Sequence, residues 1–145
     1  MAIPDLSPTA AYQLLQTRDD SVLIDVRSRV EYTHVGHPVD AIHVAWKEAP
    51  GWKPDPDFVT RVREALDIHS DSPEKLAILT LCRSGQRSLE AAQELERAGF
   101  QELYNVAEGF EGDKDDADHR GTRVLGDVRQ SFLNRTIERN FDRLG

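Results

Sequence analysis

The sequence predicts an α/β fold with a mostly parallel central sheet and helices on both of its faces. Short apolar runs alternate along the chain with segments whose apolar residues recur at helical spacing. The runs at residues 22–26 and 76–81 are almost continuously apolar, as expected of strands that are covered on both faces. Residues 76–92 follow the order strand, tight loop and helix, which places a ligand site at the carboxyl end of a strand.

Length and composition indicate one soluble domain. The chain has 145 residues, of which 39% are hydrophobic and 30% charged, so we expect a single domain over residues 1–145 with its core at about 5–123. The net charge of −8 argues against binding to nucleic acid or to anionic membranes. The first residues lack the pattern of a signal peptide, and no run approaches the ~18 apolar residues of a membrane span. We therefore expect a cytoplasmic protein.

The first predicted helix begins near the N-terminus. Ser7 stands at a helix-cap position and Pro8 follows it in the first turn. The helix is predicted to run to Gln16, with Tyr12 and Leu15 on its inner face.

Asp25 stands out in the apolar strand at 22–26 because a buried carboxylate is normally paired. Arg27, just beyond the strand, is the candidate partner. We expect Asp25 to accept hydrogen bonds from nearby loop amides and to support the structure, in preference to a catalytic role.

The segment after this strand contains three histidines. Residues 28–35 are predicted to form a short helical turn and residues 41–45 a second short strand. His34, His37 and His43 are spaced by three and six residues, which gives neither a helical i, i+4 pair nor a zinc signature. We expect no metal site, and we expect His37 to brace a loop.

The remaining elements follow from turn residues and apolar stripes. Residues 46–56 form a loop rich in proline and tryptophan, which we expect to pack against the sheet and not to cover the active site. An amphipathic helix over 58–66 is expected after Pro56. The helix beyond the 76–81 strand is expected to end at Gly99, and a further strand is predicted at 103–106.

Two segments lie beyond the last predicted strand. Residues 108–118 are densely acidic, but neither the glycine nor the glutamate that a calcium loop requires falls in position, so a solvated loop is expected. Residues 127–144 carry an apolar stripe at helical spacing and are predicted to form an amphipathic helix. That helix has two alternative partners, its own domain or another protein.

Cys82 is the only cysteine and directly follows the 76–81 strand. A strand, a tight loop and a helix start together aim backbone N–H groups and a partial positive charge at one point, so the thiol is expected to lose its proton more easily than free cysteine. Arg83 and Arg87 stand beside it, and Gly85 allows the tight turn. A lone cysteine is more often a small buried hydrophobe, but this surrounding sequence favours a thiolate nucleophile in an anion-binding cradle.

Having one cysteine also limits the chemistry. The chain contains no Cys-x-x-Cys pair, which argues against thiolate zinc sites and dithiol redox reactions. Whatever group Cys82 takes up must therefore leave to an external acceptor.

The segment Cys-Arg-Ser-Gly-Gln-Arg-Ser at 82–88 resembles the active loop of single-domain rhodaneses, which are sulfurtransferases. The similarity covers roughly residues 5–123 with its motifs in the family's order. Further matching segments are Leu23-Ile24-Asp25-Val26-Arg27, Glu31-Tyr32, Gly36-His37, Ala41, Ala98-Gly99-Phe100, Tyr104-Asn105-Val106 and Gly109-Phe110-Glu111-Gly112.

The resemblance implies a three-layer rhodanese-like fold and transfer of sulfane sulfur through a persulfide on Cys82. The implied donor is thiosulfate or a similar small anion, and the acceptor is cyanide in an assay, a cellular thiol or a sulfur-acceptor protein. No cofactor other than this covalent persulfide is expected. The implied substrate-binding residues are Arg83, Ser84, Gly85, Gln86, Arg87 and Ser88, and Asp25, Arg27 and His37 are expected to support the loop.

Two other functions stay open. A phosphatase or arsenate reductase is the alternative enzyme, although four residues separate Cys82 from Arg87, one fewer than in the phosphatase branch of this fold. A non-catalytic interaction module is the third class, with the 127–144 helix as its working surface. The physiological donor, the acceptor and the oligomeric state are also open at this stage.

Overall fold

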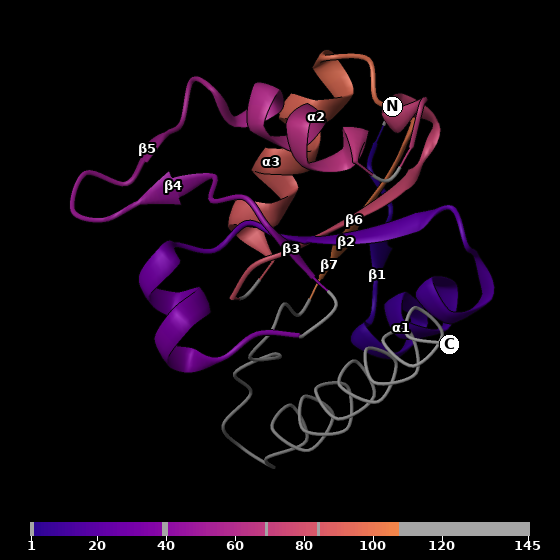
Figure 1. Ribbon diagram of the computed structural model, residues 1–145. Helices are drawn as coiled ribbons and strands as arrows, with labels where there is room; N and C mark the ends of the chain where they lie inside the picture. The colour runs from indigo at the N-terminus through magenta and orange to yellow at the C-terminus, as the bar shows by residue number, and fades with distance from the viewer. Residues whose placement is uncertain (1, 39–40, 69, 84, 108–145) are drawn as a thin grey trace, which may run out of the picture.

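The computed structural model describes residues 2–38, 41–68, 70–83 and 85–107. Five of the strands in this part of the chain form one sheet in the order β1–β7–β6–β2–β3, and every neighbouring pair is parallel (Figure 1). The strands are β1 (Asp5–Leu6), β2 (Ser21–Asp25), β3 (Ile42–His43), β6 (Ala77–Leu81) and β7 (Glu102–Val106).

Helices lie on both faces of this sheet, as predicted. In Figure 1, α2 and α3 lie on one face and α1 lies on the other. Short helical turns η1 and η2 connect the larger elements. The bounds are α1 (Pro8–Thr17), η1 (Glu31–Val35), α2 (Phe58–Asp67), η2 (Pro73–Lys75) and α3 (Gln86–Arg97).

The alternation of side chains along the central strands produces two apolar clusters. Leu23 and Leu79 pack with α1, whereas Ile24 and Ile78 belong to the cluster that contains α2 and α3. Successive residues of a strand point to opposite faces, so a strand that is apolar at every position serves both layers. Every residue of β6 is buried, and each large aliphatic side chain contributes about 1.5–3 kcal/mol by burial.

Helix α1 begins as predicted and extends one residue beyond the expected end. The side chain of Ser7 accepts a hydrogen bond from the backbone N–H of Ala10 at 3.1 Å. The expected inner face is only partly correct: Ala11 and Leu15 are fully buried, whereas Tyr12 packs at the edge of the cluster and is partly buried.

The short strands differ most from expectation. The strand expected at 41–45 contains only the two residues of β3. Residues 46–56, expected to be a loop, contain an antiparallel pair of short strands, β4 (Lys47–Glu48) and β5 (Lys53–Pro54). Strand β1, which pairs with β7 at the edge of the sheet, has no counterpart in the predicted elements. Two-residue strands are too short for an alternating pattern to be visible in the sequence.

The acidic segment 108–118 and the predicted 127–144 helix lie outside the described residues. Within the described ranges, none of the helices combines the length and apolar character needed to cross a bilayer.

Candidate active site

Cys82 lies at the carboxyl end of β6, where the chain turns into α3. The Gly85 backbone N–H donates a hydrogen bond to the Cys82 sulfur at 3.0 Å. Gly85 caps α3, which begins at Gln86. The sulfur atom is therefore at the start of a helix and in contact with a loop N–H. Cys82 is 1% exposed. Ser84 lies outside the described residues.

Gly85 is required at its position for two reasons. Its φ is +105°, a left-handed conformation that side chains with a Cβ rarely adopt. A Cβ atom built there would lie 2.1 Å from the carbonyl oxygen of Ala107, at the end of β7. The active loop is therefore pressed against the backbone that follows the neighbouring strand.

Hydrogen bonds among buried polar side chains hold the Cys82 loop in place. The Asn105 side-chain amide donates to the Gly85 carbonyl oxygen at 3.0 Å and to Asp5 on β1 at 3.1 Å. The Ser88 hydroxyl donates to Asn105 at 2.5 Å, and Thr80 donates to the Ser88 carbonyl at 2.9 Å. The structure thus places Ser88, a predicted substrate-binding residue, beneath the loop with its hydroxyl bonded to Asn105.

Arg87 lies in the first turn of α3 and is held by Glu31 of η1. Its two terminal nitrogens donate to the two Glu31 oxygens at 2.7 and 2.8 Å. The bidentate hydrogen bonds from Arg87 lower the pKa of Glu31 to about 2. The pKa of Arg87 is raised, chiefly by the same hydrogen bonds, and the negative charges of Cys82 and Asp25 add to the effect.

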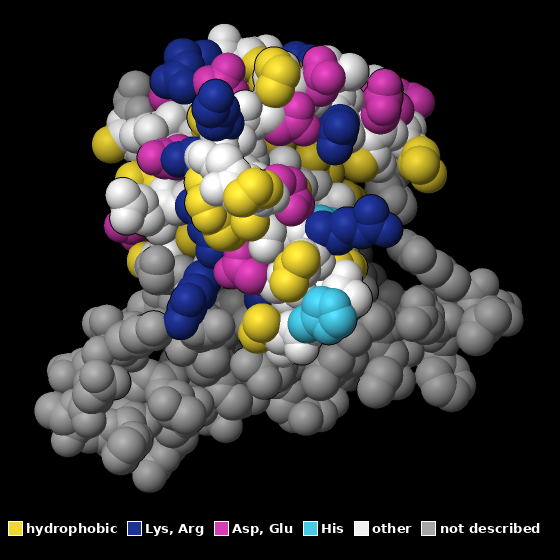
Figure 2. Space-filling view, turned by 90° about the vertical axis from the view of Figure 1, so that its left-hand side faces the viewer, with side chains coloured by type: hydrophobic (Ala, Val, Ile, Leu, Met, Phe, Trp, Pro, Cys, Tyr) yellow, Lys and Arg dark blue, Asp and Glu magenta, His cyan; other side chains and the backbone are white. Residues whose placement is uncertain are grey.

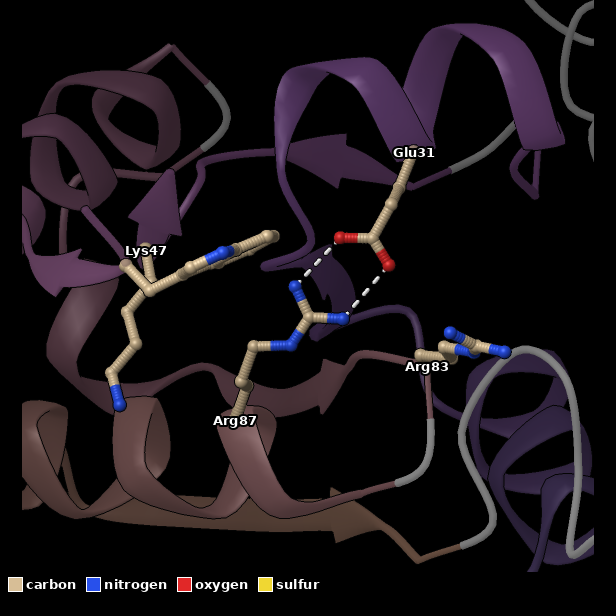
Figure 3. Close-up of a pocket in the computed structure, with 5 residues that line it drawn as sticks. Glu31, Lys47, Arg83 and Arg87 are labelled. Atoms are coloured by element: carbon tan, nitrogen blue, oxygen red, sulfur yellow. Dashed lines mark hydrogen bonds and ion pairs between the residues drawn. The ribbon is translucent and has the colours of Figure 1, made fainter. Parts of the chain in front are cut away.

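Beside this ion pair is a cavity of about 550 Å³. Figure 2 views the molecule from the side of β4 and β5, where basic, acidic and apolar side chains are interspersed. In Figure 3, Lys47 and Arg83 lie on opposite sides of Arg87, and the dashed lines mark its bonds to Glu31. Gln86 and Arg83 are both exposed. The residues that line this cavity, here called the loop pocket, are Glu31, Lys47, Trp52, Arg83 and Arg87.

The predicted pairing of Asp25 with Arg27 is confirmed. Arg27 Nη2 lies 2.7 Å from one Asp25 oxygen and Nε lies 3.0 Å from the other, with both side chains almost fully buried. The Arg27 backbone N–H also donates to Asp25 at 3.1 Å, which is the expected bond to a loop amide. Arg27 in addition donates to the Gly36 carbonyl at 2.6 Å. In the sheet, Asp25 is in register with Leu81, the residue before Cys82.

His37 contacts Tyr32 of η1. Its Nδ1 hydrogen-bonds the Tyr32 carbonyl at 2.8 Å, and its ring stacks on the Tyr32 ring with centroids 3.6 Å apart. His43 stacks on the same tyrosine at 4.2 Å. Burial is the main cause that raises the pKa of Tyr32, and the charge of Asp25 adds to it. His37 therefore braces the turn that carries Glu31.

The expected packing of the 46–56 segment is correct for one tryptophan and wrong for the other. Trp46 is buried in the core, with its ring edge-on to Phe58 at 5.1 Å. Trp52 is 46% exposed and lines the loop pocket.

Sequence reasoning did not single out Glu31, Lys47, Trp52 or Asn105 as site residues. Glu31 and Asn105 fall within segments that match the rhodanese motifs, and this similarity was the available signal for them. Lys47 and Trp52 carry no such signal, because only the β4–β5 pairing brings them to the pocket.

This chain is similar in sequence to a known domain family and to proteins from other organisms. The sequence profile of the rhodanese-like domain matches residues 7–116. The uncharacterized protein RC0915 of Rickettsia conorii is 34% identical over 119 residues, which span 80% of this chain and 90% of that protein. The thiosulfate sulfurtransferase GlpE of Glaesserella parasuis is 28% identical over 108 residues, or 74% of this chain and 83% of that protein.

A solved structure has a similar fold. The crystal structure of Rv0390 from M. tuberculosis superposes with a TM-score of 0.70 at 30% identity, and the match covers 87% of this chain and 96% of that one. The similarity therefore extends over most of both chains.

Proposed function

The chain belongs to the rhodanese-like domain family, and from this membership we propose that it is a sulfurtransferase that carries sulfane sulfur on Cys82. The observation that carries the proposal is the Gly85 N–H donated to the Cys82 sulfur at the start of α3. A relative named as a thiosulfate sulfurtransferase, 28% identical, supports the same reaction class.

The proposed reaction has two displacement steps and uses no cofactor. The Cys82 thiolate attacks the outer sulfur of thiosulfate or a similar donor, forming a new S–S bond while the donor's S–S bond breaks. Sulfite leaves with the electron pair of the broken bond, and a persulfide remains on Cys82. A nucleophilic acceptor, such as cyanide or a thiolate, then attacks the terminal sulfur and regenerates the Cys82 thiolate.

The residues around Cys82 supply electrostatic stabilisation and not proton transfer. The Gly85 N–H and the N-terminus of α3 favour negative charge on the cysteine and on its persulfide. The guanidinium of Arg87 adds a positive field, although its hydrogen bonds are made to Glu31. In this proposal Arg83 attracts the anionic donor to the mouth of the loop pocket.

Intact-mass measurement tests the proposal directly. Incubation with thiosulfate should add the mass of one sulfur atom, and cyanide should remove it with formation of thiocyanate. Because Cys82 is the only cysteine, Cys82→Ser should show neither the gain nor the turnover. Thiosulfate:cyanide activity in Cys82→Ser at the native level would refute the mechanism.

A further inference from the structure

The backbone at the start of α3 depends on support from other elements. Gly85 occupies the N-cap position with φ of +105° and makes no side-chain cap hydrogen bond. Glycine has the widest conformational freedom of all residues, and it has no side chain with which to fix its own backbone. Contacts from other elements are therefore needed to hold the peptide whose N–H is donated to the Cys82 sulfur.

Asn105 of β7 makes such a contact. Its side-chain amide donates to the Gly85 carbonyl oxygen at 3.0 Å. The backbone N–H of Leu89 also donates to this oxygen, at the longer distance of 3.3 Å. Asn105 is 3% exposed, and a lost hydrogen bond at a buried amide is not readily replaced by one to water. The Asn105 amide is therefore the shorter of two bonds that fix the Gly85 carbonyl.

The partners of Asn105 determine which way its amide points. The amide nitrogen donates to Gly85 and also to the carboxylate of Asp5 on β1, at 3.1 Å. A carbonyl oxygen and a carboxylate accept hydrogen bonds and do not donate them, so the NH₂ group must face them. The amide oxygen then faces Ser88, whose hydroxyl donates to it at 2.5 Å.

The Ser88 hydroxyl is used for this bond. Ser88 is fully buried, and its own carbonyl oxygen accepts a hydrogen bond from the Thr80 hydroxyl at 2.9 Å. A serine hydroxyl has a single proton, so the proton that Ser88 donates to Asn105 is not also donated to an anion. This arrangement differs from the substrate contact that the family resemblance implied for Ser88.

We propose that Asn105 and Ser88 are positioning residues for Cys82: Ser88 orients the Asn105 amide, and this amide holds Gly85 so that its N–H points at the sulfur. In this proposal neither residue contacts the sulfur donor. The inference rests on the proposed function, because it concerns the same cysteine. Arg87, whose charge also acts on Cys82, is held separately by Glu31.

The pH profile of alkylation by iodoacetamide tests this role. The reagent is uncharged and Cys82 is the only cysteine, so the profile reports the ionisation of this thiol and not the recognition of an anion. Ser88→Ala should raise the midpoint of the profile by about half a pH unit, because the Gly85 N–H is held less firmly. Asn105→Ala removes the bond to Gly85 itself and should raise it by about one pH unit. Easier entry of the reagent would change the plateau rate and not the midpoint.

The double variant shows whether Ser88 acts through Asn105. If it does, Ser88→Ala combined with Asn105→Ala should have the midpoint of Asn105→Ala alone, because the orienting bond has no amide left to orient. Two residues that act independently would instead give the sum of the two shifts, and that sum would contradict the proposed order of action.

Ser21→Ala is the matched control. The Ser21 hydroxyl is also buried, and it donates to the Arg18 carbonyl oxygen at 2.6 Å. Ser21 begins β2 and is in register with Ala77, the first residue of β6, whereas Cys82 follows the last residue of β6. This variant loses a buried hydroxyl at the opposite end of the sheet, so its alkylation midpoint should equal that of the native protein.

Sulfur transfer separates positioning from donor binding. If Ser88 acts on the ionisation of Cys82, Ser88→Ala should lower kcat/KM for thiosulfate at pH values near and below the midpoint and should return to nearly the native value above it. A lost contact with the donor would lower kcat/KM at every pH and leave the alkylation midpoint in place. That result would overturn the positioning role.

The possible failures are distinguishable. If neither Ser88→Ala nor Asn105→Ala moves the midpoint, the positioning role is wrong and the proposed sulfur transfer stands. If the native protein takes up no sulfur from thiosulfate, the proposed function fails, and the alkylation profiles still test how Cys82 is positioned. Melting curves identify a variant that has lost its fold. If Asn105→Ala is such a variant, the comparison of Ser88→Ala with Ser21→Ala decides.

Discussion

At the scale of single residues, the Asp25–Arg27 and Glu31–Arg87 pairs lie in different surroundings. The Asp25–Arg27 pair is almost fully buried, and removing one partner of such a pair typically costs about 3–5 kcal/mol because a charge is left unpaired. The Glu31–Arg87 pair is partly exposed at the loop pocket. Solvent screens the Glu31–Arg87 pair, so we expect it to contribute less to stability than the buried Asp25–Arg27 pair. We expect it to have the larger influence on the charge of the ligand that the pocket accepts.

The Glu31 pair should give a defined pH dependence of stability. The pKa of Glu31 falls from an ordinary value of 4.5 to about 2 on folding. Its stabilisation is therefore complete above about pH 5 and is lost as the pH falls through about 2. The difference in unfolding free energy between the native protein and Glu31→Gln should shrink between pH 5 and pH 2.5. Urea denaturation of the two proteins at pH 5 and at pH 2.5 measures this difference. An equal difference at the two pH values would contradict the lowered pKa of Glu31.

At the scale of elements, the junction of β6 and α3 depends on the neighbouring strand. The loop that carries Cys82 is short, and its glycine lies against the end of β7 through the Ala107 carbonyl. Asn105, also from β7, accepts from Ser88 and donates to the Gly85 carbonyl. The Cys82 loop is therefore positioned by an element that follows it in the sequence.

Two glycine-to-alanine substitutions should separate steric contact from backbone strain. Gly85 and Gly99 have nearly equal φ values, +105° and +104°, but a Cβ at Gly99 would meet no atom within 4 Å. Gly99→Ala should cost about 1–2 kcal/mol, the penalty of the left-handed conformation. Gly85→Ala adds the clash with Ala107, so its destabilisation should be clearly larger and its sulfur transfer reduced. Equal melting temperatures and equal activities of the two variants would contradict this account.

At the scale of the whole molecule, the parallel sheet separates two apolar clusters. Leu15 of α1 is buried on one face, whereas Ile78 of β6 packs with the cluster on the other. The parallel register of β2 against β6 joins these layers, and Cys82 belongs to the cluster on the α2 and α3 side. The fold thus holds the Cys82 side chain against a packed helix layer.

Substitutions in the two clusters should act independently. Leu15→Ala should lower the unfolding free energy by about 2–5 kcal/mol and Ile78→Val by about 0.5–1.5 kcal/mol. Because the sheet lies between the two sites, the double variant should show the sum within about 0.5 kcal/mol. Urea denaturation of the three variants measures this. A large departure from additivity would show that the two layers are coupled through the sheet.

The features that depend on neighbours in the chain could be predicted from the sequence. The α/β class followed from continuous apolar runs, because a strand covered on both faces has no polar alternation. The position of Cys82 between a strand and a helix followed from the apolar run before it and the helical pattern after it. The Asp25–Arg27 partnership followed from two residues close together at a strand end. Each of these signals lies within a few residues, so the chain order contains it.

The composition of the loop pocket was decided only by tertiary structure. Glu31 and Arg87 are 56 residues apart in the chain and meet because η1 and α3 lie at the same end of the sheet. Trp52 reaches the pocket through a pair of two-residue strands, too short to leave a periodic pattern. Sequence alone therefore determined that a cysteine loop exists and where it begins. The net charge of the loop pocket beside the Cys82 loop depends on contacts between distant segments. Only the folded chain brings these segments together.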